Sequence, residues 1–198
     1  VAMFRKQIVD HVVPITTKLY NQRKNILGLD HLYFYDSINF KEGDPKPKGN
    51  MDHLISEAQI MYRELSKETG DFFDMMVNEE LMDLENRKGK RGGGFCTAFP
   101  MYERPYIFAN FNGTDHDITV LTHEAGHAFQ VYSSRHQPLQ EYYWPTLEAC
   151  EIHSMSMEFI TWPWMEKFFK EGTDRFKYLH MAKSLSFLPY GACVDHFQ

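Results

Sequence analysis

Residues 117–132 read DITVLTHEAGHAFQVY, and this stretch decides the fold prediction. Its apolar side chains recur at the spacing of an amphipathic helix, so one face of that helix is expected to be buried. The apolar positions that share this face are Ile118, Leu121, Ala125, Phe129 and Tyr132. The same stretch contains an H-E-x-x-H pattern, which carries metal chemistry when it lies on a helix.

His123 and His127 are four residues apart, so in a helix they project about 40° from one another and both can reach one ion. Glu124 lies about 100° from His123, beside the pair, where its carboxylate can accept a proton from a water at the metal. A lone histidine is more often a surface or hydrogen-bonded core residue. The helical context therefore favours a zinc site with two histidine ligands and a catalytic glutamate.

A catalytic zinc needs a third protein ligand and an open position. The next predicted helix, residues 145–160, offers Glu148 and Glu151, which share a face, so spacing alone leaves both open. Glu158 lies on that face too and either orients a ligand histidine or is an ordinary surface residue. A fourth protein ligand such as His153 would instead close the coordination sphere, as in a structural zinc site.

The rest of the chain is also expected to be mainly helical. Further helices are predicted at residues 4–28, 50–70, 72–87 and 173–187. Pro14 is expected to kink or divide the first helix, Asn50 to cap the second, and Gly28, Gly70 and Pro189 to end three of them.

Residues 106–111 form the best strand candidate, and residues 32–36 are expected to be a strand or an extended segment. Glycines and prolines make residues 41–50 a loop, and residues 89–94 break the helix before them. The basic run at residues 87–91 is expected to be a solvated loop.

Composition limits the possible functions. The 198 residues are 43% hydrophobic and 24% charged, which is typical of one globular domain. A formal net charge of -6 argues against a nucleic-acid partner. Three cysteines without CxxC spacing indicate a reducing compartment, and the lack of an apolar run of about 18 residues argues against a membrane span. We therefore expect a cytoplasmic protein.

Four segments resemble the oligoendopeptidase F branch of the thimet oligopeptidase (M3) family. Two of them surround the predicted zinc site: THEAGHAF at 122–129 and PTLEACEIHSMSME at 145–158. The other two are GGGFCT at 92–97 and PYIFANFNGT at 105–114. The resemblance is dense between residues 89 and 164 and looser elsewhere.

This resemblance implies a zinc-dependent endopeptidase that hydrolyses short peptides in the cytosol with one Zn²⁺ per chain. The family's third ligand opens an E-x-x-S-x-x-x-E stretch, which selects Glu151 over Glu148 and puts Ser154 and Glu158 at the matching offsets. Two alternatives remain open: a zinc exopeptidase of carboxydipeptidase type, and a catalytically silent zinc-binding fragment.

The implied fold is a mainly α, zincin-like helical catalytic domain with a small β-sheet whose edge strand borders the active-site cleft. Residues 106–111 would be that edge strand, so Ala109, Asn110 and Phe111 would bind substrate by backbone pairing. The alternative is a purely structural strand, because edge exposure is not visible in a sequence. Gly93 and Gly94 would form a mobile lip beside this strand, with a plain surface loop as the alternative.

The family's substrate-binding Tyr and His residues would lie beyond Gln198, and an N-terminal part of the channel would also be absent. Residues 1–198 are therefore expected to be a single, partial catalytic domain. The sequence does not indicate an oligomeric state.

Overall fold

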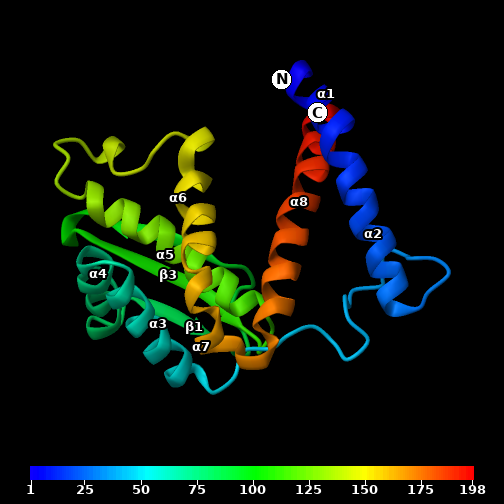
Figure 1. The fold of residues 1–198 in the computed structure, drawn as a ribbon. Coiled ribbons are helices and arrows are strands. Elements are labelled where there is room, and N and C mark those ends of the chain that lie inside the picture. The colour runs from blue at the N-terminus through cyan, green and yellow to red at the C-terminus, as the bar shows by residue number, and fades with distance from the viewer. The chain divides into compact units, whose positions relative to one another are not determined.

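The computed structural model describes residues 1–198, which form a mainly helical protein with one three-stranded sheet (Figure 1). The chain forms two compact units. One consists of Val1–Pro45 with Asp174–Gln198, and the other is Lys46–Thr173. The boundary lies within the predicted 41–50 loop, and the predicted zinc ligands all belong to the second unit. That residues 1–198 are one partial catalytic domain stays a prediction.

The sheet of the second unit contains β1 (Met82–Glu85), β2 (Phe95–Phe99) and β3 (Arg104–Phe111). The strand order is β1-β3-β2, with β1 parallel and β2 antiparallel to β3. Alternate residues of β3 are buried, as expected for a strand with one covered face. The helix α5 (His116–Ser134) packs on β3 and β2.

The prediction that residues 106–111 form an edge strand is wrong. These residues lie in β3, which is the central strand and pairs on both sides. The error arose because β1 falls within the segment predicted as a helix to residue 87. The helix ends earlier, at Asn78, and Glu80 adopts a left-handed φ of 55° that turns the chain into β1. The edge strand that packs on α5 is β2.

The helices α3 (Met51–Leu65) and α4 (Lys67–Asn78) form a hairpin. Asn50 caps α3 as predicted, because its side chain accepts a hydrogen bond of 3.0 Å from the backbone N–H of His53. Gly70 does not end this helix but lies inside α4. A Cβ there would come within 2.8 Å of the Cα of Arg63, so the glycine permits the close approach of α3 and α4.

Close packing also joins α5 to α6 (Leu147–Ile160). A Cβ on Gly126 would lie 2.7 Å from both the carbonyl oxygen of His153 and the Cα of Ser154. The two helix backbones meet at this glycine, which brings the H-E-x-x-H stretch against the next helix. Further along the chain is the short helix α7 (Met165–Phe169), and its Phe168 and Phe169 are fully buried in the core.

The first unit contains α1 (Ala2–Gln7), a π-helical turn (Ile8–Val12), α2 (Val13–Leu27) and α8 (Thr173–Phe197). The π-helical turn directly before Pro14 interrupts the regular α-helix there but does not divide it, because the backbone stays helical throughout. Gly28 ends α2 with a left-handed φ of 71°. Pro189 does not end α8, which continues to Phe197, so that predicted boundary is wrong.

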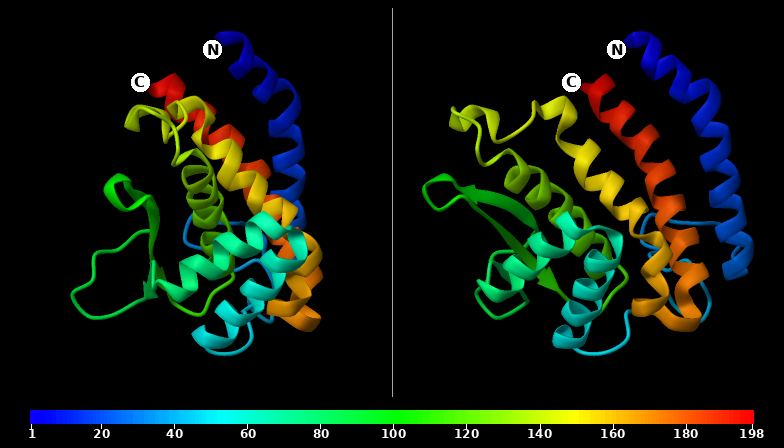
Figure 2. Two further views of the ribbon diagram at one scale, coloured as in Figure 1. Left: turned by 90° about the vertical axis from the view of Figure 1, so that its left-hand side faces the viewer. Right: turned by 60° about the vertical axis from the view of Figure 1, so that its left-hand side comes forward.

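Within this unit α2 and α8 lie side by side and antiparallel (Figure 2). Tyr178 donates a hydrogen bond to Gln22, and Arg5 pairs with Asp195 at the other end. Residues 32–36 form no strand. They make a turn in which the N–H of Asp36 donates to the carbonyl of Tyr33.

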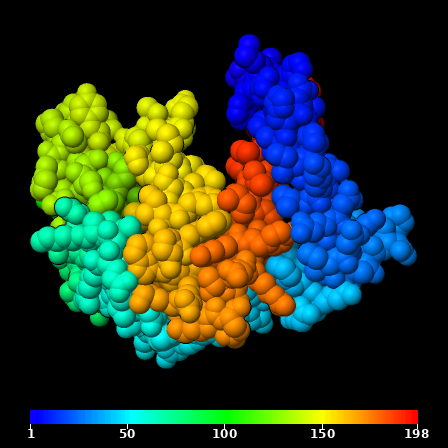
Figure 3. All heavy atoms as spheres, in the orientation of Figure 1, coloured from blue at the N-terminus to red at the C-terminus, as the bar shows by residue number.

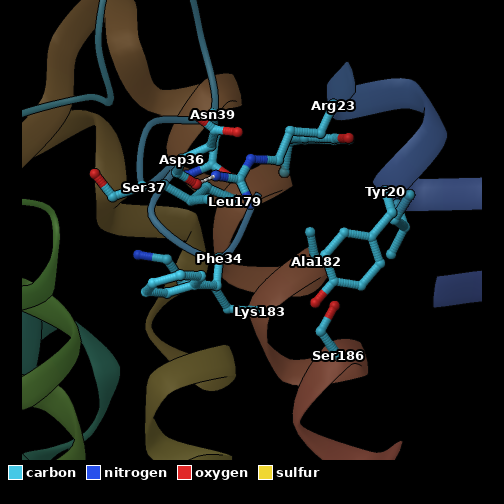
Figure 4. A pocket seen from close by; sticks show the side chains of 12 residues that line it. Tyr20, Arg23, Phe34, Asp36, Ser37, Asn39, Leu179, Ala182, Lys183 and Ser186 are labelled. Atoms are coloured by element: carbon cyan, nitrogen blue, oxygen red, sulfur yellow. Dashed lines mark hydrogen bonds between the residues drawn. The ribbon is translucent and has the colours of Figure 1, made fainter. Parts of the chain in front are cut away.

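A hollow of about 340 Å³ lies in the first unit between α2, α8 and the loop that follows α2 (Figure 4). The guanidinium of Arg23 donates to the carbonyl oxygens of Asp36 and Ile38 and so fixes this loop. No helix of the structure has both the length and the apolar composition required to cross a membrane.

Candidate metal centre

Three side chains from α5 and α6 converge at one point of the second unit. The Nε2 atoms of His123 and His127 lie 3.1 Å and 3.4 Å from the same oxygen, Oε2 of Glu151. Ligand atoms of these three residues all lie within 4.8 Å of one another. Neither Glu148 nor His153 belongs to this group.

This donor set fits a zinc ion. Zinc binds imidazole nitrogen and carboxylate oxygen at about 2.0–2.2 Å, and tetrahedral ligands at that distance lie about 3.3 Å apart. The two separations from Glu151 match this value. The carboxylate of Glu151 is 59% exposed, so this donor is open to solvent. Atoms of α6, the helix that bears it, lie on the surface in Figure 3.

Two buried side chains of α6, Glu158 and Ser154, contact two of these donor residues. Oε1 of Glu158 lies 2.6 Å from Nδ1 of His123, and the hydroxyl of Ser154 donates a 2.7 Å hydrogen bond to Oε2 of Glu151. An ionised carboxylate only accepts hydrogen bonds, so the contact with Glu158 favours, for neutral His123, the tautomer with its proton on Nδ1, in which Nε2 can bind a metal. Glu158 is thus not the ordinary surface residue that the sequence left as an alternative.

The two imidazoles differ in their electrostatics. For His123, burial lowers the pKa, but the hydrogen bond to Glu158 and the charges of Glu124 and Glu151 outweigh it, so the pKa is raised. For His127, burial and the neighbouring His123 lower the pKa. His127 therefore favours the neutral form that binds metals.

Glu124 lies beside the donors and is 93% buried, since only 7% of it is exposed. Burial raises the pKa of its carboxyl group and outweighs the charge of the neighbouring His123, which lowers the pKa. A Cβ on Gly94 would lie 3.7 Å from Oε1 of Glu124. The junction between the glycine-rich loop and β2 therefore lies against this carboxylate.

The predicted substrate residues of β3 lie in the central strand, where each has a contact within the fold. Ala109 is fully buried, and Phe111 pairs with Glu85 of β1. The side-chain amide of Asn110 donates hydrogen bonds of 2.9 Å and 2.8 Å to the carbonyls of Arg91 and Gly93. These contacts follow from the central position of β3, which leaves its backbone little freedom to pair with another chain.

Sequence reasoning missed one aromatic neighbour of the centre. The ring of Trp144 lies 6.4 Å from that of His127, centroid to centroid. Gln130 of α5 donates a 2.9 Å hydrogen bond to the carbonyl of Tyr143 and so holds the segment before α6 in place. A signal was available in the sequence, because Gln130 follows His127 by three residues and so lies on the histidine side of a helix.

The chain matches the family model described as "Peptidase family M3" over residues 1–182. Among curated proteins, it is 26% identical to "Oligoendopeptidase F homolog" of Borreliella burgdorferi, covering 89% of this chain and 30% of the relative. It is 25% identical to "Group B oligopeptidase PepB" of Streptococcus agalactiae, with coverages of 87% and 28%.

Several solved structures are more similar to this chain in sequence than these curated relatives are. The structure titled "PZ PEPTIDASE A with inhibitor 2" is 55% identical with a TM-score of 0.96, and the match covers 99% of this chain and 35% of that one. A structure described as an oligoendopeptidase F from Bacillus anthracis is 52% identical with a TM-score of 0.96, covering 98% and 36%. The chain therefore spans about a third of the length of the proteins that it matches.

Proposed function

The chain belongs to peptidase family M3, and from this premise we propose that it carries the catalytic zinc centre of an oligoendopeptidase that hydrolyses short peptides. The observation that carries the proposal is the convergence of His123, His127 and Glu151 beside the buried Glu124. Two imidazoles and one carboxylate form the donor set of many zinc peptidases, which leaves a fourth position for water or substrate.

In this proposal His123, His127 and Glu151 hold one Zn²⁺. When bound, zinc supplies Lewis acidity that polarises the scissile carbonyl group and lowers the pKa of water toward about 7. Glu158 fixes the tautomer and orientation of His123, and Ser154 fixes one oxygen of Glu151. Such outer contacts tune the affinity of the ligands that they orient.

Glu124 acts as the general base and then as the general acid. Its carboxylate takes a proton from the attacking water and later delivers this proton to the amine that leaves. Burial supports this role because it raises the pKa of the carboxyl group toward the pH at which it works.

We propose that β2, rather than β3, receives the peptide substrate. One side of β2 pairs with β3, and its other side is an edge of the sheet. An extended peptide can add to such an edge through backbone hydrogen bonds, which suits recognition that tolerates many sequences. Gly93 and Gly94 directly precede β2 and would contact the same peptide near Glu124.

We also propose that the protein works in a reducing compartment such as the cytoplasm. All three cysteines are free thiols in the structure, in agreement with a reducing environment such as the cytoplasm.

Metal analysis and a peptidase assay test this function together. The purified protein should contain one equivalent of zinc and should cleave a fluorogenic peptide that is blocked at both ends. A chelator should abolish cleavage, and added Zn²⁺ should restore it. Cleavage only of peptides with a free end would indicate the exopeptidase alternative. Zinc without any turnover would indicate a silent metal-binding protein.

A further inference from the structure

Lys90 lies in the glycine-rich loop between β1 and β2, yet its side chain is only 2% exposed. The prediction that the basic run at residues 87–91 is a solvated loop is therefore wrong at this residue. A buried ammonium group is costly unless other groups replace its water. The contacts of the Lys90 ammonium group show which groups replace its water.

The ammonium group of Lys90 contacts four acceptors. They are Oδ1 of Asp83 at 2.9 Å and the carbonyl oxygens of Ala109 at 2.6 Å, Glu85 at 2.7 Å and Asp83 at 3.0 Å. Its nitrogen also lies 4.5 Å from the centroid of the Phe108 ring. Three N–H donors are thus fully used, and Lys90 ties the start of the loop to both β1 and β3.

A second anchor holds the loop further along. The amide group of Asn110 binds the carbonyls of Arg91 and Gly93, so the loop is attached to β3 on both sides of Gly92. The ring of Phe95, the first residue after the loop, stacks on Phe108 at 5.0 Å. These contacts fix the path of the chain from Lys90 to β2.

The anchored loop ends against the centre. A Cβ on Gly94 would lie 3.3 Å from Cγ1 of Val120 and 3.7 Å from Oε1 of Glu124. At Gly92 and Gly93, in contrast, a Cβ would meet no atom within 4 Å. One side of the loop therefore touches α5 next to the catalytic carboxylate, and the other side faces open space that a substrate can occupy.

We infer that Lys90 is a positioning residue for peptide binding: it holds the loop at residues 91–94 in the form that receives substrate. This inference rests on the proposed peptidase function. A glycine-rich segment is costly to order, because glycine has more conformational freedom to lose than other residues. When Lys90 holds the loop, residues 91–94 are already ordered before the substrate binds. Without it, binding must order the loop and becomes weaker.

Lys90→Met tests the inference, because it removes the charge while keeping an unbranched side chain. Arg87 still donates to both oxygens of Asp83, at 2.7 Å and 2.8 Å, so this carboxylate keeps a partner. The expected result is a KM at least fivefold higher for a blocked peptide, with a smaller change in kcat and full zinc content. Amide hydrogen exchange of residues 91–94 should become at least tenfold faster.

Arg104→Gln is the matched control. It breaks the ion pair between Arg104 and Glu79, at 2.7 Å and 3.0 Å, which lies at the other end of β3. This variant should lose stability without a change in KM or in loop exchange. Asn110→Ala removes the second anchor and should act like Lys90→Met, which provides a test if the lysine variant does not fold.

The inference is overturned if both anchor variants behave like the control, with lower stability but unchanged KM and unchanged loop exchange. Failure of the proposed function looks different, since the unmodified protein would then show no zinc-dependent cleavage. In that case loop exchange still decides whether Lys90 orders residues 91–94.

Discussion

Oε1 of Glu158 lies 2.6 Å from Nδ1 of His123, although the two residues are 35 positions apart and belong to different helices. This contact joins α6 to α5 directly behind the Nε2 atom that faces Glu151. Glu158 is 7% exposed, so water does not compete strongly for its carboxylate. The contact has measurable consequences for metal binding.

Glu158→Gln should weaken zinc binding by about 10- to 100-fold, because a neutral amide accepts the proton of His123 less strongly and permits other ring orientations. Competition with a chromophoric chelator measures the affinity. Glu148→Gln is the control on the same helix, since Glu148 is exposed and lies outside the donor group. Equal affinities for the two variants would remove Glu158 from the centre.

Glu151→Gln should reduce zinc occupancy to a small fraction of the wild-type value, whereas Glu148→Gln should leave one equivalent bound. The reason is that only Glu151 places an oxygen within 3.4 Å of both Nε2 atoms. Elemental analysis after dialysis against a weak chelator gives the result. Loss of zinc from the Glu148 variant instead would reverse the assignment of the third ligand.

Glu124→Gln should keep zinc bound and lower kcat by about 10²- to 10⁴-fold, the usual contribution of a general acid–base group. The amide cannot accept the proton of the attacking water. Zinc content and turnover of a blocked peptide must be measured on the same preparation. A variant that retains zinc and full turnover would show that another group moves the proton.

Gly126→Ala should lower the free energy of unfolding by about 1–3 kcal/mol, because the added methyl group has no space between α5 and α6. Separation of the helices should also loosen the contact of both histidines with Glu151 and weaken zinc binding. Thermal unfolding with and without zinc measures both effects.

Gly92→Ala is the control for this substitution, because a Cβ at Gly92 meets no atom within 4 Å. Its stability should stay within about 0.5 kcal/mol of the wild type. If Gly126→Ala is equally harmless, the two helices do not depend on this close approach.

Local patterns in the sequence predicted much of the second unit. The apolar period of residues 117–132 and the spacing of His123 and His127 predicted α5 and the shared direction of its histidines, because a helix is set by neighbours three and four residues apart. Asn50 predicted the start of α3 for the same local reason. Spacing alone did not separate Glu148 from Glu151, and only the resemblance to a family favoured Glu151.

The predictions from sequence were wrong where contacts between residues far apart in the chain determine the local structure. β1 is a strand of four residues without clear alternation, and its pairing with β3 makes β3 central rather than an edge. Gly70 and Pro189 are common helix-ending residues, but both lie inside helices here. For Gly70 the reason is tertiary: its missing side chain permits α4 to approach α3.

The sequence by itself determined the residues that can form the centre: a helix with two histidines and a glutamate, and a following helix rich in glutamate. Only the tertiary structure decided which of these residues meet, which strand lies at the edge beside Glu124, and that Lys90 is buried. The physical reason is that helix periodicity depends on residues within one or two turns. Strand order and the burial of a charge depend instead on partners that are distant in the chain.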